Sequence, residues 1–118
     1  MSKLCTLIVL CLFISCSTLD KMAVSTTADL AYKGAVDMER EKDWDSFEKS
    51  ALPNLKFLEG LLQSDPSNEK LLALLVKGYA SYAFGVYETN HLAENFSSAS
   101  STLNKHKAIH YFSKAWSY

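Results

Sequence analysis

The chain has 118 residues, of which 48% are hydrophobic and 12% are aromatic, and its formal net charge is −1 at pH 7. This length is near the lower limit for burying a hydrophobic core, so a single domain is expected. The 12 basic and 13 acidic residues alternate without forming a basic patch, which argues against nucleic acid as a partner. Glycine and proline are scarce and leucine is abundant, and this composition favours an all-α fold.

The first 15 residues have the pattern of an export signal. One positive charge precedes a largely apolar run over residues 4–14, which is too short to cross a bilayer as a helix of about 20 residues. The run ends in Ser15-Cys16, which resembles the lipobox of bacterial lipoproteins, where the cysteine carries the lipid. We therefore predict a lipoprotein signal peptide over residues 1–15, lipidation at Cys16 and a lipid-proximal tether over residues 16–27. An ordinary cleaved signal peptide is the alternative.

The cysteines support packing rather than disulfides as the source of stability. Cys5 and Cys11 lie inside the predicted signal peptide, so Cys16 is the single thiol expected in the mature chain. An intrachain disulfide is then excluded, even in an exported protein.

Residues 28–42 lack a clear hydrophobic period, and we expect a short helix or irregular structure there. Asp43 or Asp45 can cap a following helix, because a carboxylate oxygen accepts the free N–H groups of a first helical turn. Pro53 lies inside that helical pattern. It is expected to kink the helix or to mark the first turn of a new one, because it has no backbone N–H.

The most strongly patterned stretch, residues 50–88, predicts two helices that fold back on one another. Leu55, Leu58 and Leu62 fall on one face of the first helix. The second helix, over residues 69–88, is apolar on almost every side, so it needs neighbours on two sides.

A short polar segment separates these two helices. Asp65-Pro66 ends the first helix, because proline disfavours helical geometry in the residue that precedes it. Ser67 or Asn68 then supplies the cap of the second helix.

The helical pattern breaks after the second helix and resumes near Leu103. Residues 89–92 are predicted to form a turn, and residues 97–102 form a serine-rich loop. The last helix carries an apolar stripe made of Ile109, Phe112 and Trp116.

Two details suggest a repeat architecture, and the first is Asp65-Pro66-Ser67-Asn68, which looks like the turn between tetratricopeptide units. Ala108, Phe112 and Ala115 have the spacing of small and aromatic residues in the second helix of a tetratricopeptide unit. Fewer than two such units fit in the chain, which stops at Tyr118 within the pattern. We therefore interpret residues 28–118 as the N-terminal part of an incomplete helical array of tetratricopeptide-like (TPR-like) hairpins, apparently truncated.

The hairpin and its flanks resemble the T component of TRAP transporters, the TatT-type lipoproteins. The segments that carry the resemblance are Ala51-Leu52-Pro53, Leu55, Leu58-Glu59, Leu61-Leu62, Asp65-Pro66, Leu71-Leu72, Gly78-Tyr79 and Tyr82-Ala83. The similarity covers about residues 28–118 and includes the lipoprotein start.

The resemblance implies an α-helical lipoprotein on the periplasmic side of a bacterial membrane. It implies docking to the solute-binding P component and transfer of small hydrophobic or carboxylate solutes, with a homo-oligomer such as a trimer as a further expectation. It brings no catalytic motif and no cofactor. The alternative is a general TPR-type lipoprotein that scaffolds assembly of the cell envelope.

Residues that could carry chemistry are few. His106 and His110 have a spacing that can chelate a metal, but Lys107 stands between them and no further ligand is evident, so two solvated histidines are the preferred interpretation. The sequence has no nucleophile elbow, phosphate loop or paired-carboxylate arrangement, and we predict that the protein is not an enzyme.

Aromatic residues on the second hairpin helix are the candidate binding residues. Tyr79, Tyr82 and Tyr87 have apolar bodies and polar tips, which suit a cavity for an amphipathic organic acid. Ordinary packing between helices would use the same residues. Phe84 shares a polar stripe with charged residues, so we expect it to face a partner subunit or a ligand.

Overall fold

The computed structural model describes residues 2–97 and 102–118, with side chains from residue 19 onward except at residues 38 and 39. Its elements are α1 (Ser2–Glu39), α2 (Trp44–Ser64), α3 (Glu69–Tyr82), the π-helix η1 (Ala83–Glu88), α4 (Thr89–Phe96) and α5 (Leu103–Trp116). Every element in the described part of the chain is a helix, which confirms the all-α class. The TPR-like detail stays a prediction.

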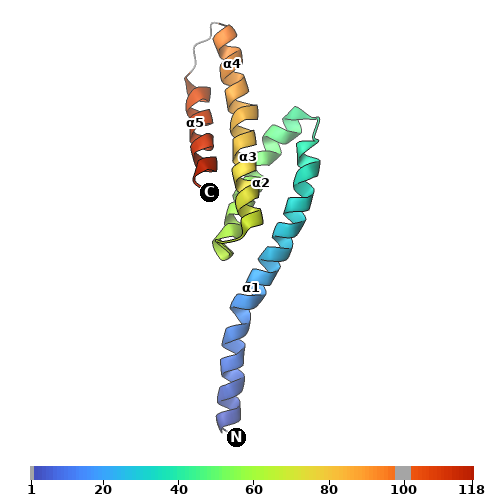
Figure 1. Cartoon of the computed structure of the whole chain (residues 1–118), viewed down its shortest axis with the longest axis vertical. Coiled ribbons are helices and arrows are strands. Elements are labelled where there is room, and N and C mark those ends of the chain that lie inside the picture. The colour runs from blue at the N-terminus through green and yellow to red at the C-terminus, as the bar shows by residue number, and fades with distance from the viewer. Residues whose placement is uncertain (1, 98–101) are drawn as a thin grey trace.

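The helices form an elongated molecule of 81 × 26 × 19 Å (Figure 1). The segments α3, η1 and α4 follow one another as one continuous rod, and α5 runs back beside it (Figure 1). The N-terminal part of α1 extends beyond the other helices (Figure 1).

Helix α1 runs through the predicted tether and most of residues 28–42, where we expected a short helix or irregular structure. Val24 is 8% exposed and Ala28 is fully buried, and both pack with Leu71 of α3. The contact between α1 and α3 therefore begins before residue 28. The start of the mature chain at Cys16 stays a prediction. Within the described residues, no helix meets the length and hydropathy needed to cross a membrane.

The predicted caps of α2 and α3 are confirmed at Asp43 and Asn68. Asp43 Oδ1 accepts the backbone N–H groups of Asp45, at 3.1 Å, and of Ser46, at 3.4 Å. Asn68 Oδ1 accepts the N–H of Leu71 at 3.2 Å. These side chains replace the intrahelical acceptors that a first turn lacks.

Both ends of α2 and its internal proline follow from local chemistry. The helix ends at Ser64, directly before Asp65-Pro66, as predicted. Pro53 lies inside α2 and does not begin a new helix. Its side chain is exposed.

The turn predicted over residues 89–92 was wrong. The backbone stays helical through α4, and the change in pattern is absorbed by the π-helix η1. A π-turn bonds residue i to i+5 and so takes up one residue more than an α-turn. Tyr82 and Tyr87, five residues apart, would lie about 140° apart on an α-helix. Here their hydroxyl oxygens are 3.4 Å apart.

The main core lies between α2, α3, η1 and α5, and its largest fully buried side chains are those of Tyr79, Leu75 and Val86. Gly78 lets α2 approach α3, because a Cβ there would come within 2.4 Å of Leu55 Cδ2. Helix α5 starts at Leu103, as predicted, and buries Ala108 and Ala115.

The predicted apolar stripe of α5 is present and faces solvent. Ile109 is 52% exposed, Phe112 is 38% exposed and Trp116 is 92% exposed. Helix α5 therefore packs on the other helices through Ala108, Ala115 and Tyr111, and not through this stripe. Residues 98–101 of the predicted serine-rich loop lie outside the described residues.

Candidate functional site

Five of the six tyrosines gather where α3 and η1 face α5 and the residues that follow it. This tyrosine cluster consists of Tyr79, Tyr82, Tyr87, Tyr111 and Tyr118. Two of its members, Tyr111 and Tyr118, come from the last eight residues of the chain, so the cluster depends on the docking of α5.

The rings of the cluster stack in a continuous series. Tyr79 lies between Tyr111, at 5.9 Å between ring centroids, and Tyr118, at 6.0 Å. Tyr87 stacks on Tyr111 at 5.5 Å, and Tyr82 meets both rings edge-on. Each such pair adds about 0.5–1.5 kcal/mol beyond the burial of its area.

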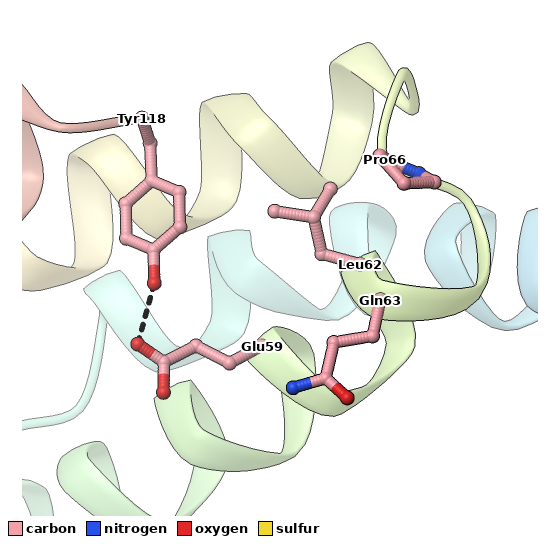
Figure 2. A pocket seen from close by; sticks show the side chains of 5 residues that line it. All are labelled: Glu59, Leu62, Gln63, Pro66 and Tyr118. Atoms are coloured by element: carbon pink, nitrogen blue, oxygen red, sulfur yellow. Dashed lines mark hydrogen bonds between the residues drawn. The ribbon is translucent and has the colours of Figure 1, made fainter.

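Glu59 of α2 binds the hydroxyl end of this cluster (Figure 2). Its Oε1 accepts a hydrogen bond from the hydroxyl of Tyr79 at 2.8 Å, and it also accepts one from the hydroxyl of Tyr118. Lys114 Nζ forms an ion pair with the same oxygen, and Lys56 Nζ binds Oε2 at 3.0 Å. One carboxylate thus joins α2, α3 and α5.

These bonds fix the charge of Glu59. Partial burial works against the charged form, but hydrogen bonds from Lys114, Tyr118 and other donors outweigh it and lower the pKa of Glu59 to about 2. Burial, followed by the hydrogen bond to Glu59, raises the pKa of Tyr79 to about 12. The carboxylate therefore stays ionised and the phenol stays protonated at neutral pH.

A shallow pocket of about 380 Å³ opens beside this group (Figure 2). Its apolar wall is made by Leu62, Pro66 and the ring of Tyr118, and its polar groups are Glu59 and the amide of Gln63. Both oxygens of Glu59 already accept hydrogen bonds. The arrangement therefore suits binding of an amphipathic group better than proton transfer.

Two lysines of α5 lie over rings of the cluster. Lys107 Nζ is 5.2 Å from the centroid of Tyr87, and Lys114 Nζ is 4.8 Å from the centroid of Tyr79. Burial opposes the charge of Lys114, but the bond to Glu59 outweighs it and raises the pKa of the ammonium group. Both cations are held against the tyrosine cluster.

The structure brings together three of the four predicted binding residues. Tyr79 is fully buried, Tyr82 is 5% exposed and Tyr87 is half-buried, and all three belong to the cluster. Phe84 is 59% exposed and lies outside it. The burial of Tyr79 and Tyr82 gives them a packing role.

Sequence reasoning missed Glu59, Lys114, Tyr111 and Tyr118 as members of the site. Glu59 and Tyr118 lie 59 residues apart, so no local pattern links them. The i, i+7 spacing of Tyr111 and Tyr118 on the buried side of α5 was the signal that could have found them.

The remaining candidates lie elsewhere. His106 and His110 are exposed, and the ring of His110 meets Tyr111 edge-on at 5.0 Å. Among the residues that the structure describes, no group of three or more potential metal ligands occurs. The side chain of Cys16 lies outside the described part, so its lipidation stays a prediction.

Comparison with known proteins gives one match. The family model of the TRAP transporter T-component matches residues 40–118, which is more than half of the chain. Neither a search of curated proteins nor a search of solved structures found a match.

Proposed function

Because the chain belongs to the TRAP transporter T-component family, we propose that it is a lipid-anchored subunit that docks the solute-binding P component. The T component is a periplasm-associated accessory part of a transporter, and its family is not a family of enzymes. The match over residues 40–118 is the observation that carries the proposal.

The exposed ring of Phe84 supports a docking surface on η1. The ring is 59% exposed although its neighbours Ala83 and Val86 are buried. A large apolar side chain in this position gains the free energy of burial when a partner covers it.

Phe57 provides a matched control, because it is 58% exposed on α2. We expect Phe84→Ser to weaken binding of the purified P component by about tenfold, since fully burying such a ring is worth about 1.5–3 kcal/mol. Phe57→Ser should bind as the wild type does. Calorimetric titration measures both, and circular dichroism checks that helicity is kept. Equal binding by all three proteins would reject Phe84 as a docking residue.

The lipid anchor is supported by the apolar run and by Ser15-Cys16 at its end. Acyl chains add about 0.8 kcal/mol per buried CH₂, so a multiply acylated cysteine would hold the protein at the membrane. We expect Cys16→Ala to move the protein from the membrane fraction to the soluble fraction, and mass spectrometry should find acyl groups on Cys16 of the wild type only. If the wild-type protein is exported without acyl groups on Cys16, the proposed lipid anchor is refuted.

The pocket beside Glu59 supports a role in handling small amphipathic solutes. It combines an apolar wall with the polar groups of Glu59, Gln63 and Tyr118. Two lysines, Lys56 and Lys114, form ion pairs with its Glu59. A carboxylate solute with a short apolar tail has matching chemistry.

A further inference from the structure

The side of α5 that faces α3 and η1 carries a row of cations over aromatic rings, and we call this row the basic strip. It consists of Lys107, Tyr111, Lys114 and Tyr118, which recur along one side of the helix and its C-terminal end. Helix α5 contains no acidic residue. Its opposite side carries Lys105, which is exposed.

The basic strip offers positive charge at two places. Lys107 lies over Tyr87 and pairs with no carboxylate among the described residues. Lys114 shares the single carboxylate of Glu59 with Lys56, so two cations face one anion there. Each place therefore retains about one uncompensated positive charge at neutral pH.

One carboxylate of α2 acts against this charge. Burial above all, and then Tyr87, Tyr111 and Glu48, raise the pKa of Tyr82. Glu48 is therefore within electrostatic reach of Tyr82, whose ring packs against those of Tyr87 and Tyr111, and its carboxylate is exposed.

The spacing of the charges selects the shape of a ligand. Lys107 and Lys114 are seven residues apart on an α-helix, which separates them by about 10.5 Å along the axis. An extended peptide in the polyproline II conformation covers that distance in about three residues at about 3.1 Å per residue, and its three residues per turn bring side chains i and i+3 to the same side. The pocket lined by Leu62, Pro66 and Tyr118 lies beyond Lys114.

We propose that the basic strip binds an extended acidic segment of a partner protein. Two carboxylates three residues apart contact Lys107 and Lys114, and an apolar side chain that follows them enters the pocket. The partner is defined by this chemistry, so the proposal does not require that the P component supply the segment.

Fluorescence anisotropy with a labelled peptide tests the proposal on the full-length protein. The probe has two aspartates at positions i and i+3, separated by glycine and serine and followed by leucine. We expect saturable binding that weakens as salt is raised. Peptides with asparagine in place of both aspartates, or with the aspartates adjacent, should bind at least about threefold more weakly.

Three charge variants locate the contact. Lys107→Gln should weaken binding about three- to fivefold, because one partly exposed ion pair is lost. Lys105→Gln makes the same charge change on the opposite side of α5 and should leave binding unchanged. Glu48→Gln should tighten binding, because it removes a repelling carboxylate. Circular dichroism verifies that all three variants keep their helicity.

Several results would overturn the proposal. Equal weakening by Lys105→Gln and Lys107→Gln would show non-specific attraction by net charge. Free glutarate that competes as well as the peptide would identify a small solute instead of a protein segment. Absence of saturable binding would show that the basic strip does not bind an acidic segment. None of these results bears on the Phe84 surface, so the two proposals fail separately.

Discussion

At the scale of single residues, Glu59 joins α2 to both α3 and α5 through one carboxylate. It receives bonds from α3, from α5 and from Tyr118, and its side chain is 18% exposed. Its pKa is lowered from 4.5 to about 2. A group with a lowered pKa stabilises the fold at pH values above its unfolded pKa, and this contribution is lost as the pH falls through the folded pKa.

We therefore expect the free energy of unfolding of the wild type to fall as the pH drops from about 4.5 towards about 2. Glu59→Gln should lose about 2–3 kcal/mol at pH 7 and should lack this part of the pH dependence. Urea unfolding across this pH range measures both effects. Glu69→Gln changes an exposed carboxylate and should stay within about 0.5 kcal/mol of the wild type. Parallel pH curves for wild type and Glu59→Gln would contradict the role assigned to Glu59.

At the scale of elements, the π-helix keeps the tyrosines in register. Tyr82 and Tyr87 reach the same side of the rod because η1 takes up one extra residue between them. Tyr79 and Tyr82 precede η1, whereas Tyr87 is the second-to-last residue of η1. A change in the helical geometry of η1 therefore rotates Tyr87 relative to Tyr79 and Tyr82.

Deleting Phe84 tests this role. The deletion places Tyr82 and Tyr87 four residues apart, which is one face of an α-helix, so we expect η1 to become α-helical and the cluster to survive. Near-ultraviolet circular dichroism should keep the tyrosine signal.

Deletion of Ser81, an exposed residue of α3 between Tyr79 and Tyr82, is the matched control. It rotates Tyr82 and everything after it by about 100° relative to Tyr79 and should abolish the tyrosine signal. Loss of the signal in both deletions would contradict the compensating role of η1.

The elements also show how far sequence reasoning reached. Asp43 and Asn68 were found because capping depends on residues within one turn. The π-helix was missed, because residues 83–88 were predicted as the end of one regular helix and six residues give no usable period of their own. The break in the pattern was instead assigned to a turn at residues 89–92, which are helical. Glu59 was missed as a site residue because its partners lie on α3 and α5, and only the tertiary fold brings them near.

At the scale of the whole molecule, several large apolar side chains remain exposed on the described chain. They include Phe84 on η1 and the outer stripe of α5 that contains Trp116. Exposed apolar side chains that lie together are typical of surfaces that contact other proteins. The long α1 extends away from these surfaces, so a lipid at Cys16 would leave them accessible (Figure 1).

Affinity purification of the full-length protein from its native envelope, followed by mass spectrometry, tests the central claim most directly. The account predicts enrichment of a TRAP solute-binding subunit with the wild type, and reduced enrichment with Phe84→Ser at equal protein level. Enrichment of envelope-assembly proteins, with no solute-binding subunit above the level of an untagged control, would contradict it.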